Sequence, residues 1–381
     1  MWAGLLLGPS LLGWLWPSGF AAVFPGPSLP ALNALSQIGL VLFMFIVGLR
    51  LGSHTSGGLR HAAIVTSLTS IAAPFVLGAW LATTLHARLA PAGVGLLPFA
   101  LFVGAAMSIT AFPVLARILV DHQLLNTNLG VIAISCAAFD DVAGWLILAV
   151  VMTFAGGNAG GPSVPARMLM LAAYLAVMLF AVRPALRRLV TSRVHMTAPP
   201  AERLVVPLLV LLLSAVVTEL VGVHALFGAF FAGLIVPRGA GLEEIFVERV
   251  EPMTVTLLLP IFFAFTGLRT SVQLVDSLPL VRDAIVILIV AVAAKGGASA
   301  LAARASGLPW KDAAALGALV NTRGLIELVI LNVGLDAGVL APRIFSMMVL
   351  MAVVTTCMTS PLLNALGLAT SGRGRAASVE T

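Results

Sequence analysis

Two adjacent carboxylates, Asp140 and Asp141, lie in the middle of the apolar run AISCAAFDDVAGWLILAV, residues 133–150. The run is long enough to cross a bilayer, where an ionised carboxylate costs roughly 2.5 to 3.5 kcal/mol on insertion scales. On a helix the two side chains point about 100° apart, so they cannot share one partner. We expect one carboxylate to pair with a cationic side chain and the other to face a water-filled cavity.

Lys295, in the segment AVAAKGGASA, is the expected partner because it is the one lysine inside an apolar run. Lysine can lose its proton when it is desolvated, whereas arginine keeps its charge. A Lys–Asp pair can therefore be made and broken with a proton, which an Arg–Asp pair cannot. The alternative is a static ion pair that fixes helix packing, and such a pair does not require a second carboxylate beside the first.

Two further pairs of polar residues lie in or near apolar runs. Arg323 and Glu327 are four residues apart in NTRGLIELVIL, the spacing at which side chains meet on one helix face. They either contribute to a site or only neutralise each other inside the membrane. Glu219 and His224 lie near the boundary of two runs, and we expect them to cap a helix or to lie at the membrane interface.

One apolar run, GAAMSITAFPVLARIL, contains Ser108, Thr110 and Pro113, which interrupt a helix. Proline removes a backbone donor and clashes with the preceding turn. The carbonyl groups freed near Ser108 need a partner within the membrane, and a cation in a cavity is one such partner. A kink that affects only packing is the alternative.

A second run, GALVNTRGLIEL, has Asn321, Thr322 and Gly324 in similar places. The two runs belong to halves of the chain that are expected to have opposite topology. Paired interruptions in inverted halves are the best pointer in a sequence to the binding site of a secondary transporter. We therefore expect the two interrupted helices to meet at a site.

The composition places these residues in an integral membrane protein. Of 381 residues, 60% are hydrophobic and only 9% are charged, and the mean hydropathy is +1.10. A soluble domain carries about 25% charged residues. The two cysteines form no CxxC motif, so no disulfide framework or metal site is predicted. The net charge of +6 is a matter of membrane topology and does not indicate nucleic-acid binding.

Twelve apolar runs indicate transmembrane helices, and helices are favoured over a barrel by run length and by the Leu, Ala and Val content. The expected spans are 1–17, 32–51, 62–85, 96–120, 129–154, 166–186, 203–222, 223–237, 252–270, 280–303, 311–334 and 342–368. The first is short unless it extends past Pro17 or the chain begins upstream. The seventh and eighth could be one broken helix, which would leave eleven.

The basic residues favour twelve spans. With that count, 14 of the 21 basic residues lie on one side of the membrane, five lie on the other, and Lys295 and Arg323 lie within spans. Because cytoplasmic loops carry the excess of basic residues, both termini are expected in the cytoplasm. Merging the seventh and eighth spans would destroy this asymmetry.

Four segments, SITAFPVLARIL, AAFDDVAGW, VHALFGAFFAGLIVP and NTRGLIELVILNVGL, resemble the monovalent cation:proton antiporter-2 family. The chain is most similar to the branch with bacterial sodium/hydrogen exchanger-like proteins, plant cation/H⁺ exchangers and the membrane part of Kef-type transporters. The resemblance runs nearly from end to end. It implies the sodium/proton antiporter fold, with inverted repeats and two crossing unwound helices.

The resemblance also implies a domain organisation and roles for residues. Residues 1–371 would form the exchanger domain, with a mobile core of 62–154 and 280–368, a dimerisation part made of the remaining helices, and a disordered tail at 372–381. Asp141 matches the carboxylate that binds the cation and the proton, and Asp140 matches its neighbour, paired with Lys295. Thr110 and carbonyl groups near Ser108 match the ligands of the unwound helix.

The sequence thus predicts a Na⁺/H⁺ or K⁺/H⁺ antiporter of the inner (plasma) membrane that contributes to pH homeostasis. Cation and proton would compete at Asp141, and a homodimer in the bilayer is expected, with no cofactor and no nucleic acid. A sodium- or proton-coupled solute symporter, a cation channel and a non-transporting sensor are the alternatives. A membrane enzyme is disfavoured because neither HExxH nor clustered His and Cys residues occur.

Overall fold

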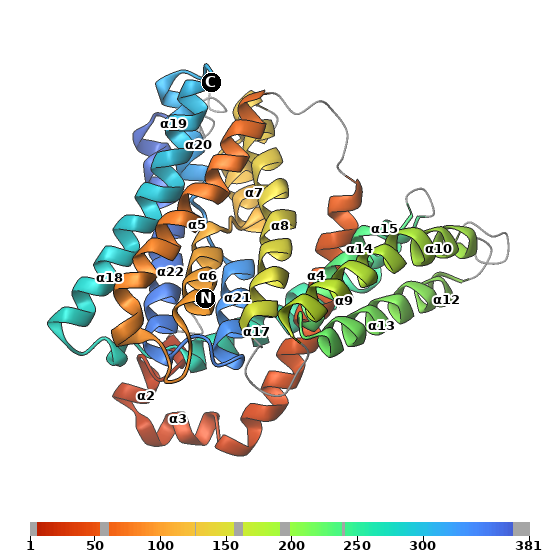
Figure 1. Ribbon diagram of the computed structural model, residues 1–381, viewed down its shortest axis with the longest axis horizontal. Helices are drawn as coiled ribbons and strands as arrows, with labels where there is room; N and C mark the ends of the chain where they lie inside the picture. The colour runs from red at the N-terminus through yellow and green to blue at the C-terminus, as the bar shows by residue number, and fades with distance from the viewer. Residues whose placement is uncertain are drawn as a thin grey trace, which may run out of the picture. The chain divides into compact units, whose positions relative to one another are not determined.

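The computed structural model describes residues 6–53, 61–125, 127–155, 163–190, 199–237 and 241–368. The side chains of Pro113 and Asp141 lie outside this description, and so does the expected tail at 372–381. Every regular element in the described ranges is a helix (Figure 1). The predicted all-α membrane fold is confirmed.

The chain divides into two compact units. The first unit comprises Met1–Gly57 and Leu148–Ser271, and the second comprises Gly58–Ile147 and Val272–Thr381. Each unit is therefore assembled from two separate stretches of sequence. The division lies close to the boundaries expected for a core and a dimerisation part, whose roles stay predictions.

The second unit contains the helices that carry most of the expected site residues. Its elements before residue 148 are α5 (His61–Leu89), α6 (Leu96–Ser108), α7 (Phe112–Asp121) and most of α8 (Asn128–Ala155). Its later elements are η4 (Val272–Leu274), α18 (Leu278–Ala291), η5 (Val292–Gly297), α19 (Ala298–Ala305), α20 (Trp310–Val320), α21 (Leu325–Asp336) and α22 (Pro342–Ala365). The π-helical segment η5 joins α18 to α19, so residues 278–305 form one continuous helical segment.

The first unit begins with three short helices and one long one. These are α2 (Leu12–Leu15), α3 (Pro17–Val23), η1 (Gly26–Ser28) and α4 (Leu29–Ser53). Its middle part holds α9 (Val164–Val177), η2 (Met178–Val182), α10 (Arg183–Val190), α12 (Pro200–Arg203), α13 (Val205–Val221) and α14 (Ala225–Leu234). It ends with α15 (Leu242–Arg249), α16 (Glu251–Met253), η3 (Thr254–Leu258) and α17 (Leu259–Arg269).

The described residues contain seven helices long and apolar enough to cross a membrane, or eight if the bent pair α20–α21 counts as one span. Four further apolar helices in these ranges are shorter, so the count of twelve stays a prediction. The expected span over 1–17 is wrong for its described part. There α2 has only four residues, and Pro17 starts a new helix because proline fits the first helical turn.

The expected seventh and eighth spans are separate helices. Gly222 ends α13 in the left-handed conformation, with φ at 84°, and its N–H donates to Glu219 O at 2.9 Å. A helix commonly ends in this way, because glycine adopts a positive φ without a steric penalty. The chain then reverses and α14 packs against α13. With 10 residues, α14 is too short to cross a bilayer alone.

In the first unit, α4 and α14 approach each other through glycines. A Cβ atom placed on Gly233 would lie 2.0 Å from Phe45 O, and one placed on Gly48 would lie 2.0 Å from Phe230 O. Small residues let the backbones of membrane helices come this close, where dispersion forces hold them together. The apolar composition of α4 therefore makes it suitable to cross the membrane, and Gly48 allows its close contact with α14.

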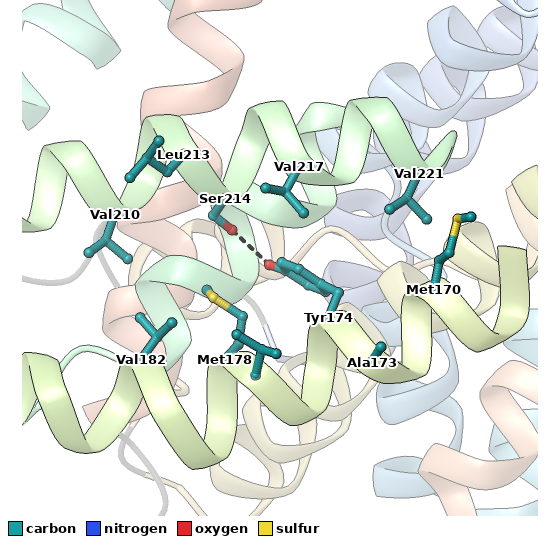
Figure 2. Close-up of a pocket in the computed structure, with 11 residues that line it drawn as sticks. Met170, Ala173, Tyr174, Met178, Val182, Val210, Leu213, Ser214, Val217 and Val221 are labelled. Carbon is teal, nitrogen blue, oxygen red and sulfur yellow. Dashed lines mark hydrogen bonds between the residues drawn. The ribbon is translucent and has the colours of Figure 1, made fainter.

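The first unit also contains a cavity of about 430 Å³ between α9–η2 and α13, lined by apolar side chains. Figure 2 shows Tyr174 reaching across it to Ser214, with the two hydroxyl oxygens 2.7 Å apart. Ser214 Oγ donates to Gly228 O at 2.7 Å, so the Tyr174 hydroxyl donates to Ser214. None of the expected site residues lines this cavity.

Candidate functional site

The two interrupted helices meet inside the second unit. Between α6 and α7, Ile109 and Ala111 have extended backbone, and between α20 and α21 the helix stops at Val320. Ala111 N–H donates to Thr322 O at 3.0 Å, and the Thr110 hydroxyl lies 2.9 Å from Val320 O. The prediction that these two interrupted helices cross is confirmed. Each break satisfies part of the other's freed backbone, as membrane burial requires.

Asp140, on α8, is fully buried beside this crossing. Its carboxylate accepts from the Thr110 hydroxyl at 2.5 Å and from the Ser70 hydroxyl at 2.9 Å. Lys295 Nζ lies 3.1 Å from Asp140 Oδ2, and neither side chain has exposed surface. Side chains from α5, the α6–α7 break and η5 therefore converge on a carboxylate that belongs to α8.

Lys295 uses all three of its protons. Besides Asp140, its ammonium group donates to Ser70 O at 2.9 Å and to Ser108 O. The π-helical turn η5 carries this lysine, and such turns are frequent at functional sites. The Ser108 carbonyl lies at the last turn of α6, where carbonyl groups lack a partner in their own helix. A buried ammonium group thus offsets the negative end of α6.

The other expected ligands of the first interruption are placed differently from one another. Thr110 directs its hydroxyl at Asp140, whereas the Ser108 hydroxyl donates to Gly104 O of its own helix at 2.7 Å. Only the main-chain oxygen of Ser108 thus faces the site. Asp141 follows Asp140 on α8, and the position of its carboxylate lies outside the described part of the chain. Its role stays a prediction.

Arg323 and Glu327 form a fully buried pair, with Nη1 of the arginine 3.1 Å from Oε1 of the glutamate. The sequence spacing predicted this contact between the two side chains, but Arg323 also contacts another helix. Its guanidinium group donates to Met107 O at 2.8 Å and to Ala106 O at 3.3 Å. Arg323 therefore joins the second interruption to the end of α6, as its planar fork of donors allows.

The remaining residues of the second interruption support the backbone. The Thr322 hydroxyl donates to Leu319 O at 2.6 Å, so its side chain bonds to its own helix. A Cβ atom on Gly296 would lie 3.6 Å from the Asn321 Cβ, which places Asn321 beside the residue that follows Lys295. Thr356 donates to Arg323 O at 2.5 Å and fixes the loop from α22.

Ser70 and Thr356 were missed from the sequence. Each is a single hydroxyl in a long apolar helix, where most serines and threonines only bond back to their own helix. The hint for Ser70 is the cluster of polar residues in TSLTS, on a helix that would otherwise be apolar. The expected capping roles are confirmed: Glu219 accepts from Ala225 N–H at 2.7 Å, and His224 caps α14.

We expect Arg323→Lys to weaken the junction between the two interrupted helices although it keeps the positive charge. A lysine cannot donate to Glu327, Ala106 O and Met107 O in the same planar arrangement. A buried acceptor left without its partner costs about 1–3 kcal/mol. Thermal unfolding in detergent will show this loss, and it will also appear as slower transport.

Arg117→Lys is the matched control, because Arg117 is exposed and, within the described ranges, forms an ion pair with Asp121 of its own helix alone. An exposed ion pair contributes about 0–1 kcal/mol, so this variant will unfold as the wild type does. If Arg323→Lys were as stable as Arg117→Lys, the contacts of Arg323 with the end of α6 would not contribute to the fold.

Charge balance within the site is the feature that bears on function. In the described part of the second unit, two carboxylates and two cations are fully buried, as the pairs Asp140–Lys295 and Arg323–Glu327. Within each pair, the positive and the negative charge neutralise each other. The formal charge of Asp141, which follows Asp140 on the same apolar helix, has no counterpart among these four groups.

Residues 1–365 match the protein family described as "Sodium/hydrogen exchanger, transmembrane". The chain belongs to the sodium/hydrogen exchanger family. Na(+)/H(+) antiporter NhaS4 of Synechocystis sp. is 40% identical over 361 residues, which are 94% of this chain and 88% of that protein. The family assignment agrees with the four motifs found in the sequence.

Two eukaryotic relatives are longer than this chain. Cation/H(+) antiporter 17 of Arabidopsis thaliana is 38% identical over 94% of this chain and 44% of its own length. K(+)/H(+) antiporter 1 of Saccharomyces cerevisiae is 31% identical, over 94% and 42%. The chain thus spans less than half the length of these plant and yeast relatives.

The fold is similar to that of a solved sodium proton antiporter. The sodium proton antiporter MjNhaP1 from Methanocaldococcus jannaschii superposes with a TM-score of 0.60, over 97% of this chain and 91% of that one. At 16% sequence identity this similarity concerns the fold alone. The predicted sodium/proton antiporter fold is confirmed.

Proposed function

We propose that this exchanger-family protein carries a monovalent cation, Na⁺ or K⁺, across the membrane in exchange for protons. The observation that carries the proposal is the charge balance of the second unit. Asp140 and Glu327 each have a buried cationic partner at 3.1 Å, and we assign the mobile positive charge to Asp141, the carboxylate that follows Asp140 in the sequence. A proton and a monovalent cation both satisfy that need, and they exclude each other.

Competition at Asp141 would couple the two fluxes. Protonation of the carboxylate removes the charge that holds the cation, and cation binding requires that the proton has left. The Thr110 hydroxyl and the main-chain oxygens of the two interruptions would supply neutral ligands for the cation, since oxygen atoms replace the hydration shell of the ion. Asp140 and Lys295 would hold the core together and would exchange a partner as Asp141 changes its charge.

Alternating access would come from movement of the second unit, as the mobile core, past the first unit, which would mediate dimerisation. We infer an inner (plasma) membrane location with both termini in the cytoplasm, from the distribution of basic residues. The relatives named above include one Na⁺/H⁺ and one K⁺/H⁺ antiporter, and both ions are therefore tested. The described residues contain no group of three His, Cys, Asp or Glu that could hold a metal ion.

Exchange in proteoliposomes tests the function. A pH gradient is imposed across vesicles that contain the purified protein and a pH-sensitive dye, and Na⁺, K⁺ or Li⁺ is added outside. We expect at least one cation to dissipate the gradient, and choline to have no effect. Protein-free vesicles give the leak, and an added ionophore gives the full amplitude. Folded, inserted protein that moves protons in response to none of the three cations would contradict antiport.

A further inference from the structure

A group of buried oxygen atoms lies next to Lys295 and has no part in the mechanism above. Thr66 and Ser299 are fully buried, and Asn321 is 4% exposed. Thr66 Oγ1, Ser299 Oγ and Asn321 Oδ1 have no hydrogen-bond partner among the described residues. Buried polar groups are nearly always bonded to protein or to ordered water. Three such oxygens together therefore call for a ligand.

The helices that carry Thr66 and Lys295 run antiparallel. Lys295 Nζ donates to Ser70 O at 2.9 Å. Further along α5, Arg88 lies 3.2 Å from Asp283, which precedes Lys295 on its own helix. Residue numbers thus increase along α5 in the direction in which they decrease along α18 and η5. Two contacts of this kind fix which residues of the two helices lie at the same level.

The unpartnered oxygens lie at one such level, a single helical turn from the ion pair. Thr66 comes four residues before Ser70 on α5, and Ser299 comes four residues after Lys295 on α19, which packs against α5. Residues four apart share a helix face. Asn321 packs against Gly296, beside Lys295. The three residues thus lie within about one helical turn of Lys295, and we call them the polar layer.

These hydroxyls differ from others in the same unit. Ser108 and Thr355 bond to carbonyl groups of their own helices, at 2.7 Å and 2.9 Å. Such back-bonding is the usual arrangement for a hydroxyl within a helix. Thr66 and Ser299 depart from it, so their oxygens remain available to a ligand.

The layer is closed on its far side by apolar residues. Ala63 lies about one turn before Thr66 and Ala303 one turn after Ser299, and both belong to a buried hydrophobic cluster that includes Leu316 and Leu319. A ligand of this layer is therefore enclosed between the ion pair and an apolar wall. Water suits such a site, since a buried water makes about three hydrogen bonds to otherwise unsatisfied polar groups.

We propose that Thr66, Ser299 and Asn321 hold ordered water next to Lys295, and that this water accepts a hydrogen bond from the lysine when Asp140 becomes protonated. The three protons of Lys295 have three protein acceptors, and Asp140 is one of them. Protonation weakens that acceptor, and an ammonium proton buried without a partner is costly. Water from the polar layer then replaces the carboxylate. Thr66 and Ser299 act as positioning residues for Lys295.

This proposal rests on the antiport function and concerns its proton-loaded half. It adds a second proton, on Asp140, to the one that competes with the cation at Asp141. Cation/cation exchange at high pH leaves both aspartates ionised, whereas cation/proton exchange also protonates Asp140 and releases Lys295. The two modes can be measured in the same vesicles, by isotope counterflow of the transported cation and by a pH-sensitive dye.

The test uses Thr66→Val and Ser299→Ala, which remove the hydroxyls and change little volume. Thr355→Val is the matched control, since that hydroxyl already bonds to Met351 O of its own helix. We expect the two variants to slow cation/proton exchange about tenfold and to leave cation/cation exchange within about twofold of the wild type. The control will leave both modes unchanged. A uniform loss of both modes in the two variants would mean a structural role only and would overturn the role in proton transfer.

A density map of the wild type at a resolution that shows water tests the site directly. Solvent density within hydrogen-bonding distance of Thr66 Oγ1 and Ser299 Oγ is expected, and this density should be lost in Ser299→Ala. Hydroxyls that bond to protein carbonyls instead, with no solvent density, would overturn the proposal. The map separates this proposal from the antiport function, because a wild type that transports nothing would refute antiport whether or not water is seen.

Discussion

The Asp141→Asn variant will be inserted and folded, yet it will move no protons in response to Na⁺, K⁺ or Li⁺. Asparagine keeps the size of the side chain but neither ionises nor carries the negative charge that a proton or cation must neutralise. We expect cation-driven proton movement to fall about 100-fold or more, which corresponds to about 2.7 kcal/mol at 1.36 kcal/mol for each tenfold change. Proteoliposomes with an internal pH dye measure this loss.

Two control variants define what the loss means. Asp121→Asn makes the same change at the end of α7, where the carboxylate is exposed and pairs with Arg117, and it should transport as the wild type does. Asp141→Glu keeps the charge and should retain part of the activity. Full exchange by Asp141→Asn would contradict competition at this residue and would leave the adjacent aspartates without a functional explanation.

Removal of one partner of the buried pair Asp140–Lys295 should destabilise the protein strongly. Lys295→Met leaves a carboxylate with no cation in a site without exposed surface, and Asp140→Asn leaves the ammonium group without its carboxylate. Breaking a buried pair in this way costs about 3–5 kcal/mol. Chemical or thermal unfolding in detergent micelles, followed by tryptophan fluorescence, measures the change in the free energy of unfolding.

The double variant Lys295→Met with Asp140→Asn should recover much of this stability. A neutral pair of similar volume needs no compensation inside the membrane, and replacing a whole buried pair is often close to neutral. The double variant will nonetheless lose cation/proton exchange if Lys295 takes part in the cycle. Additive losses in the two single variants, with no recovery in the double variant, would show that the two side chains are not coupled.

Much of the fold was predictable because the bilayer limits what a sequence can do. Apolar runs of spanning length became helices with ends within a few residues of the expected ones, as in α8, expected over 129–154 and observed over Asn128–Ala155. The break after α6 followed from Pro113 and its polar neighbours. The first span was mispredicted, since hydropathy does not register the break at Pro17, where α3 begins.

The site was predictable where charge decided the contact. A lysine and an aspartate inside the membrane each need a partner, so Lys295 could be paired with one of the two adjacent aspartates from the residues alone. The resemblance to the antiporter family implied that this aspartate is Asp140, and the functional roles of the site residues stay predictions. Contacts to backbone were not predictable. Arg323 reaches Ala106 O and Met107 O only because two interrupted helices cross, and no spacing in the sequence encodes that geometry.

The complete burial of Asp140 and Lys295 has a consequence for how the protein responds to electrolyte. Dissolved ions screen charges that they can surround, over a Debye length of about 8 Å at physiological ionic strength, and they screen buried pairs much less. An inert salt such as choline chloride will therefore not loosen this pair. A slower exchange in concentrated NaCl or KCl would report occupancy of the transport site by the ion itself, which allows specific inhibition to be separated from a general salt effect.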